Sequence, residues 1–135
     1  MQKKIIALSC VVGVLLLCNL VLAGGLADSP WPAFKGDSAC TGRSQYKGTD
    51  VGNVKWTFDA GSQVYSSPVI GVDGTIYIVS AKGIIFALNP DGTVKWKYET
   101  GTDSLSSVTL GKGGEIYYGS YKPLKVFSLN PDGSV

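Results

Sequence analysis

The sequence contains no histidine, and it has few cysteines and little net charge. Without histidine the chain cannot assemble a histidine general base, a histidine metal ligand or a Ser-His-Asp triad. Its three cysteines are too few for a disulfide framework. No amphipathic helical pattern is present either, which excludes folds built from helical repeats.

The N-terminus has the pattern of a secretory signal peptide, because two lysines precede an apolar run at residues 5–22. Small residues offer cleavage sites after Ala23 or Ala27. We therefore predict that residues 1–27 are a signal peptide and that the protein is secreted, periplasmic or held in the cell envelope. The alternative is an uncleaved membrane anchor, because a predominantly apolar run 18 residues long approaches the length that spans a bilayer.

Removal of this segment changes the charge and the cysteine count. Two of the 12 basic residues leave, so 10 basic and 10 acidic side chains remain and the net charge becomes zero. A chain of this charge offers no basic surface for nucleic acid. Cys40 stays as a single cysteine in an oxidising compartment, either as a free thiol or bonded to a cysteine elsewhere in a longer chain.

An internal repeat of about 40 residues indicates a repeat architecture. The positions that recur 40 residues on are Trp56 with Trp96, Gly61 with Gly101, Ser66 and Ser67 with Ser106 and Ser107, Gly74 with Gly114, and Ile76 and Tyr77 with Ile116 and Tyr117. Beyond these positions the offset between the repeats becomes 41, because one residue is inserted around residues 120–125.

Each repeat is predicted to contain four short strands and no helix. In the first repeat these strands are expected at residues 65–70, 75–80, 84–89 and 93–100. The second and third are apolar on both faces, as in strands covered from two sides, whereas the fourth alternates and so lies at an outer edge. "NPDG" at residues 89–92 suits a tight turn that joins antiparallel strands. The fold class is therefore all-β, a β-propeller of four-stranded antiparallel blades.

The order of the strands predicts how much of a propeller this chain contains. Residues 28–51 lead into the repeats, and residues 52–135 form a partial propeller. Residues 53–61 match a fourth strand without its own blade, and one full blade and three strands of a second follow. The chain stops in "NPDGSV", where the first repeat continues into its fourth strand. We expect an N-terminal fragment whose remaining blades belong to a longer chain.

Several residue types could carry chemistry, and each also has a structural explanation. Asp73, Asp91, Asp103 and Asp132 all lie beside turn residues, where an aspartate usually caps its own backbone. The serines of "SS" at residues 66–67 and 106–107 lie on the first strand, which lines the channel of a propeller. They could contact a ligand there, but packing in a crowded channel wall is favoured.

The glycines and tyrosines of the second repeat have similar alternatives. "GKGG" at residues 111–114 precedes a strand, so it is predicted to be a hairpin and not a phosphate loop. Tyr117, Tyr118 and Tyr121 cluster near the inserted loop and could stack on a sugar or a peptide if exposed. At least one of Tyr117 and Tyr118 should pack in the core. We identify no catalytic residue and no metal ligand, and cofactor-binding residues are not assigned.

The repeat "SSPVIGVDGTIYIVSAKGIIFALNPDGTVKWKYETG" resembles that of the pyrroloquinoline-quinone-type propellers. This superfamily includes quinoprotein alcohol dehydrogenases and the non-catalytic propeller of the outer-membrane assembly machinery. "WPAFKGDSACTGRS" is similar to the first segment of many secreted members. The resemblance implies that Trp56 and Trp96 dock between neighbouring blades. The "NPDG" turn is shorter than the turn containing "TG" that is typical of the dehydrogenases.

Two functions agree with these observations. The favoured one is a non-catalytic secreted or periplasmic propeller, a scaffold that binds a protein or polysaccharide without a cofactor, without nucleic acid, and with a membrane contact only through an uncleaved signal anchor. The alternative is a fragment of a pyrroloquinoline-quinone-dependent dehydrogenase, for which the resemblance implies calcium and a catalytic aspartate supplied mostly by other blades. Fold resemblance does not by itself assign an activity.

Overall fold

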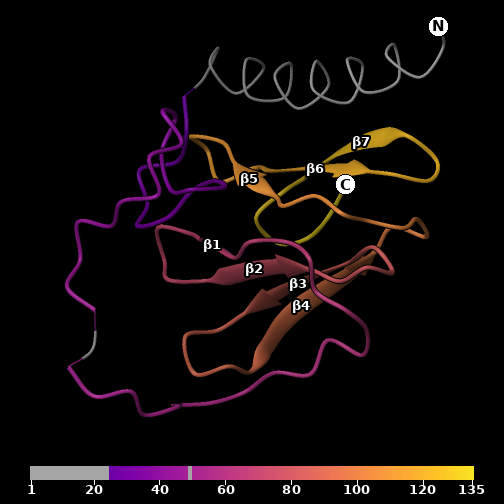
Figure 1. The fold of residues 1–135 in the computed structure, drawn as a ribbon. Helices are drawn as coiled ribbons and strands as arrows, with labels where there is room; N and C mark the ends of the chain where they lie inside the picture. The colour runs from indigo at the N-terminus through magenta and orange to yellow at the C-terminus, as the bar shows by residue number, and fades with distance from the viewer. Residues whose placement is uncertain (1–24, 49) are drawn as a thin grey trace, which may run out of the picture.

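The computed structural model describes residues 25–48 and 50–135, and this part of the chain is all-β. It contains one antiparallel sheet of four strands in the order β1-β2-β3-β4 and one of three strands in the order β5-β6-β7 (Figure 1). The strands are β1 (Val69–Ile70), β2 (Ile76–Val79), β3 (Ile84–Leu88), β4 (Val94–Glu99), β5 (Thr109–Leu110), β6 (Ile116–Ser120) and β7 (Lys125–Leu129).

Most of the predicted signal peptide, residues 1–24, lies outside the described residues. Within the described part, no helix is long and apolar enough to cross a membrane. The cleavage sites after Ala23 and Ala27 therefore remain predictions.

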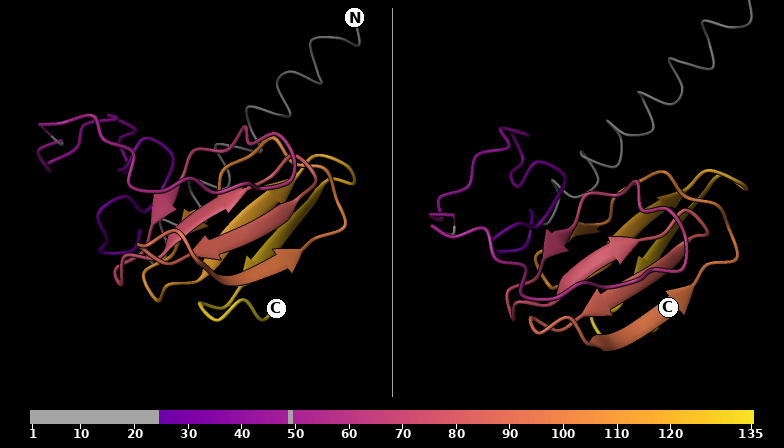
Figure 2. Two further views of the ribbon diagram at one scale, coloured as in Figure 1. Left: turned by 90° about the horizontal axis from the view of Figure 1, so that it is seen from below. Right: turned by 60° about the horizontal axis from the view of Figure 1, so that its bottom comes forward.

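The two sheets stack as neighbouring blades, as Figures 1 and 2 show. Their facing side chains form one hydrophobic core, which explains the apolar residues on one face of the second and third strands of the first repeat. On the other face Phe86 packs against Phe58, with 5.0 Å between the ring centroids. The prediction that β4 is an outer strand is confirmed, because four of its six residues are exposed and two are half-buried. The buried members of the core are Val69, Tyr77, Val79, Ile85, Ala87, Val108, Leu110, Ile116, Tyr118 and Leu129.

The "NPDG" turn has the predicted geometry. Gly92 has a φ of 87°, its N–H donates to the carbonyl of Asn89 at 2.9 Å, and the β3/β4 register shifts between Ala87 and Leu88. The positive φ and the adjacent bulge let the two strands rejoin in an antiparallel ladder. Gly133 repeats the turn with the same φ.

The first strand of each repeat is shorter than predicted. β1 has two residues, where six were expected at residues 65–70. Pro68 has no N–H to donate to a ladder. The hydroxyl of Ser66 replaces the ladder here, because it donates to the carbonyl of Val79 at 3.0 Å and accepts from the Val79 N–H at 2.9 Å.

Residues 53–61 lie where the fourth strand of a preceding blade would lie. The indole of Trp56 donates to the carbonyl of Pro90 at 3.0 Å, and the indole of Trp96 donates to the carbonyl of Pro131 at 3.1 Å. The predicted docking of both tryptophans on the next blade is therefore confirmed. Residues 53–60 are extended but belong to no strand in the described part of the chain, since a fourth strand needs the third strand of its own blade for a ladder.

Residues 26–32 join the inner edges of both blades. The N–H of Ile70 donates to the carbonyl of Trp31 at 2.7 Å, and the N–H of Leu110 donates to the carbonyl of Pro32 at 2.9 Å. A third hydrogen bond runs from the N–H of Ala27 to the carbonyl of Leu110 at 3.1 Å. The N-terminal segment thus holds the ends of β1 and β5 together.

Candidate functional site

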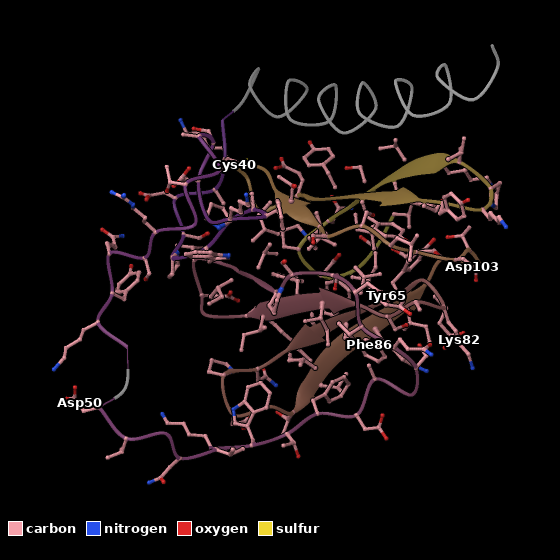
Figure 3. The ribbon with its side chains drawn as sticks, viewed as in Figure 1. Cys40, Asp50, Tyr65, Lys82, Phe86 and Asp103 are labelled. Atoms are coloured by element: carbon pink, nitrogen blue, oxygen red, sulfur yellow. The ribbon has the colours of Figure 1, made fainter. Side chains whose placement is uncertain are left out.

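The most distinctive surface of the two blades lies at the end where the β2–β3 and β6–β7 hairpins turn. We call it the loop face, and it consists of these hairpin tips, residues 80–84 and 120–125, together with residues 61–68 and 100–108, which lead into β1 and β5. Figure 3 shows Tyr65, Lys82 and Asp103 gathered at this end, away from Cys40 and Asp50.

Backbone hydrogen bonds hold the loop face rigid. The N–H of Ala81 donates to the carbonyl of Gln63 at 2.7 Å, and the equivalent N–H of Tyr121 donates to the carbonyl of Asp103 at 2.9 Å. The N–H of Ser104 reaches back to the carbonyl of Ala81 at 2.9 Å and so links one blade to the next. Side chains on these loops are therefore presented from fixed positions, which favours binding.

Close packing at Gly83 adds to this rigidity. Both the N–H and the hydroxyl of Thr100 donate to the Gly83 carbonyl, at 3.1 and 2.8 Å. A Cβ at Gly83 would lie 1.8 Å from the carbonyl oxygen of Thr102, and the residue has a φ of 70°. Only glycine allows this approach of the hairpin to the connection between the blades.

The exposed side chains of the loop face combine aromatic rings with cations. Tyr65 is 63% exposed and Tyr121 is 49% exposed. The Nζ atom of Lys122 lies 5.3 Å from the centroid of the Tyr121 ring. Lys82 is also exposed. Exposed tyrosine rings can stack on flat apolar surfaces and donate hydrogen bonds at their edges, which suits sugars and peptides.

Of the three tyrosines predicted to cluster, the structure places only Tyr121 on this surface in an exposed position. Tyr118 is 1% exposed and stacks on Phe127 with 5.7 Å between the ring centroids. Tyr117 is half-buried on the opposite face of β6. The expectation that at least one of Tyr117 and Tyr118 packs in the core is confirmed.

The serine pairs bond to backbone. As in the first repeat, the hydroxyl of Ser106 contacts the carbonyl of Gly119. The hydroxyl of Ser107 accepts from the N–H of Ser67 at 2.8 Å, which joins the inner strands of the two blades. These contacts explain why small hydroxyl side chains recur here, and they support the structural interpretation of Ser66, Ser106 and Ser107.

Three of the four candidate aspartates cap turns. The carboxylates of Asp73, Asp91 and Asp132 each accept from the backbone N–H and the hydroxyl of the residue two positions on. Asp103 differs from the prediction, because its backbone bridges Lys122 and its side chain is exposed on the loop face. Backbone hydrogen bonds to the hairpin between β6 and β7 hold Asp103 in this position, with its N–H donating to the carbonyl of Lys122 at 3.2 Å.

The electrostatics of these carboxylates agree with structural roles. A hydrogen bond from Lys95, followed by those from Thr75, lowers the pKa of Asp73 to about 2. Lys95 Nζ lies 2.9 Å from Asp73 Oδ2. Hydrogen bonds from Thr93 and Ser134 also lower the pKa of Asp91 and Asp132. A carboxylate held in its ionised form by local donors is poorly suited to act as a general base near neutral pH.

The remaining candidates from the sequence, the glycines of "GKGG" and Cys40, do not form a binding site. Gly111 and Gly114 belong to the turn between the antiparallel strands β5 and β6, which confirms that "GKGG" is a hairpin. Cys40 is a free and exposed thiol in the N-terminal segment. Within residues 25–48 and 50–135 there is no group of three or more acidic or cysteine side chains that could hold a metal ion.

Sequence reasoning missed Tyr65, Lys82 and the position of Lys122 on the loop face. The signal was available in part, because Lys82 and Lys122 are equivalent at the 40-residue offset. Both lie at the tip of the hairpin between the second and third strands of their blades. A residue that recurs at an exposed hairpin tip is a candidate for binding.

The comparisons with known proteins support the fold. No protein-family model matches the chain, and no curated protein sequence matches it. Among solved structures, a quinohemoprotein alcohol dehydrogenase from Comamonas testosteroni is similar, with a TM-score of 0.64 and 22% sequence identity. The match covers 86% of this chain and 20% of the dehydrogenase chain, so this chain spans about a fifth of that length. The resemblance to pyrroloquinoline-quinone-type propellers is thus confirmed at the level of the fold.

Proposed function

We propose that these blades belong to a quinoprotein-like propeller and that the loop face is the side that meets its ligand. The observation that carries this proposal is the combination of a rigid backbone with Tyr65, Tyr121, Lys82 and Lys122 exposed on one end of the blades. The activity of the whole protein has two candidates.

The first candidate is a quinone-dependent dehydrogenase, and the comparison favours it over a non-catalytic scaffold. The solved structure to which this chain is similar is a quinohemoprotein alcohol dehydrogenase, and the match runs over most of this chain. The described residues do not by themselves fit the calcium that the family resemblance implies, because they contain no cluster of three acidic side chains. We therefore assign no residue of this chain to the metal or to the chemistry, and these blades would act as scaffold and channel wall.

A cofactor titration of the purified protein tests this candidate. Pyrroloquinoline quinone with calcium is added, and binding is followed by quenching of tryptophan fluorescence and by reduction of an artificial dye after an alcohol is added. Saturable quenching with alcohol-dependent dye reduction is the expected result for a dehydrogenase. The absence of both signals from the folded full-length protein, with all its blades, would contradict this candidate.

The second candidate is a scaffold that binds a polysaccharide or a protein, and the exposed rings of the loop face favour it. Tyr65→Ala and Tyr121→Ala should each weaken binding to polysaccharides about 5-fold if the rings stack on sugars, since one aromatic contact contributes about 1 kcal/mol. Tyr46→Ala is the matched control, because Tyr46 is also exposed but lies in the N-terminal segment. Equal losses of polysaccharide binding in all three variants would show that the loop face is not the binding surface.

Export from the cytoplasm is a separate part of the proposal, supported by the two lysines and the apolar run at residues 5–22. The mass of the intact protein, isolated from the envelope or medium of the producing cells, should correspond to a chain that begins after Ala23 or Ala27. An exported protein that keeps its first 23 residues would instead support the uncleaved anchor.

A further inference from the structure

The two ends of the blades carry opposite charge. Because the strands of each sheet run antiparallel, successive connections alternate between the loop face and the opposite end. We call this opposite end the turn face, and it consists of residues 71–75, 89–93, 111–115 and 130–134. The loop face has the lysines Lys82, Lys122 and Lys125 and one acidic residue, Asp103, whereas the turn face has the acidic residues Asp73, Asp91, Glu115 and Asp132 and one lysine, Lys112. The fold thus separates charges that nearly cancel over the chain as a whole.

The lysines at the two hairpin tips, Lys82 and Lys122, have no ion-pair partner in the described residues. The ion pairs of this part of the chain involve Lys47, Lys95 and Lys97, none of which belongs to the loop face. Both tip lysines are exposed. Lys82 is exposed although a second blade follows its own, so a lysine at this position keeps its exposure when a neighbouring blade is present.

In the first blade the tip lysine has an exposed aromatic ring beside it. The N–H of Ala81, next to Lys82, donates to the carbonyl of Gln63 at 2.7 Å. Tyr65 follows two residues after Gln63, is 63% exposed, and lies at the same end of the blade as Lys82 (Figure 3). This blade therefore presents a cation and a flat apolar ring from a fixed backbone.

The second blade repeats this arrangement at the 40-residue offset. The N–H of Tyr121, next to Lys122, donates to the carbonyl of Asp103 at 2.9 Å. Leu105, the equivalent of Tyr65, is 61% exposed. The ring of Tyr121 is 49% exposed, and the Nζ atom of Lys122 lies 5.3 Å from its centroid. Each of the two blades thus combines an unpaired cation with exposed apolar side chains.

We propose that the loop face binds an acidic polysaccharide, a chain of sugars that carry carboxylates. This inference rests on the proposed function, in which the loop face meets the ligand, and it names the class of that ligand. The tip lysines pair with carboxylates while the tyrosine rings stack on the apolar faces of the sugars. Packed sheets lie about 10 Å apart, so one polymer chain contacts both blades, and its second contact forms at a high effective concentration.

The distribution of charge also favours a polymer of moderate charge density. Duplex DNA carries one negative charge per about 1.7 Å of its axis and is bound by many cations at once, whereas each of these blades offers one tip lysine. The carboxylates of the turn face repel a polyanion at the other end of the blades. The field of the two blades therefore directs an acidic polymer to the loop face.

Binding of the full chain to two matched polymers tests the proposal. Polygalacturonate carries a carboxylate on every sugar, and its fully methyl-esterified form has the same sugar backbone without the charge. The affinity of the protein for each polymer is measured by calorimetry at low and at moderate salt. We expect polygalacturonate to bind about 10 times more tightly than the ester, and this preference should shrink as salt screens the lysines.

Lysine variants locate the contact on the loop face. Lys82→Gln and Lys122→Gln should each weaken binding to polygalacturonate about 3- to 5-fold, the effect of losing one exposed ion pair, and the double variant should lose about 10-fold. Lys112→Gln is the matched control, because Lys112 is also an exposed lysine in a hairpin turn but belongs to the turn face. It removes the same charge and should leave the affinity unchanged.

Four results would overturn the acidic class of ligand. They are equal binding of the two polymers, no binding of either, an equal loss in Lys82→Gln and Lys112→Gln, and tighter binding of single-stranded DNA than of polygalacturonate, which would indicate a nucleic-acid ligand. Loss of binding in Tyr65→Ala without loss in the lysine variants would refute this inference and leave the loop face as the binding side. No loss in any tyrosine or lysine variant of a protein that binds polygalacturonate would refute the loop face as well.

Discussion

The contact of Gly83 with the connection between the blades leads to a measurable difference between two glycines. Gly83 and Gly101 have nearly the same backbone conformation, with φ values of 70° and 67°. An added Cβ at Gly83 would lie 1.8 Å from the carbonyl oxygen of Thr102, whereas nothing lies within 4 Å of one at Gly101. Substitution of each by alanine therefore separates the effect of steric contact from the effect of backbone strain.

The strain is common to both variants. An alanine in the left-handed region costs about 1–2 kcal/mol. At Gly83 the Thr102 carbonyl must also move, and an overpacked contact of this type costs about 1–3 kcal/mol. The two hydrogen bonds that Thr100 donates to the Gly83 carbonyl would weaken as well, each contributing about 1 kcal/mol. We expect Gly83→Ala to lower the free energy of unfolding by about 2–4 kcal/mol more than Gly101→Ala does.

Urea unfolding followed by tryptophan fluorescence measures this difference. All proteins are compared at one concentration, because self-association would shift the apparent stability. Gly83→Ala should move the unfolding midpoint much further than Gly101→Ala at a similar slope. Equal midpoints would show that the hairpin tip does not pack against the Thr102 carbonyl in solution.

Three further predictions concern single side chains. Asp73→Asn should lower stability at neutral pH by less than about 1 kcal/mol, because the ion pair with Lys95 is half-exposed. Since folding depresses the Asp73 pKa from 3.8 to about 2, its contribution is complete above pH 3.8 and is lost as the pH falls through 2; unfolding curves of both proteins between pH 2 and pH 7 should converge at the acid end. Trp96→Phe keeps the ring contact but removes the indole hydrogen bond to Pro131, so we expect a loss of about 1 kcal/mol in urea unfolding, and no loss would mean that the bond contributes nothing. The hydroxyl of Tyr118 is buried without a partner in the described residues; Tyr118→Phe should therefore leave the melting temperature unchanged or raise it, and a marked decrease would reveal a hidden partner.

Much of the fold was predictable because its information is local or periodic. The offset of 40 residues, the apolar second and third strands and the "NPDG" turn together specify blades. Gly92 supplies the positive φ that this turn requires. The roles of Trp56 and Trp96 followed from the family resemblance, and the structure confirmed them.

The candidate site was less predictable, because exposure depends on neighbours distant in sequence. Tyr117, Tyr118 and Tyr121 are close in sequence, yet only Tyr121 is exposed on the loop face, since β6 turns Tyr118 into the core between the blades. Tyr65 and Lys82 come from different loops, and the backbone hydrogen bond from Ala81 to Gln63 brings these loops together.

What the sequence by itself determined is therefore the architecture, since strand periodicity and turn chemistry are properties of short segments. The tertiary structure decided which residues meet. It joined Ser67 to Ser107 across the blades and held Asp103 in an exposed backbone bridge with Lys122. Each of these contacts joins segments that are distant in sequence, so no local pattern specifies it.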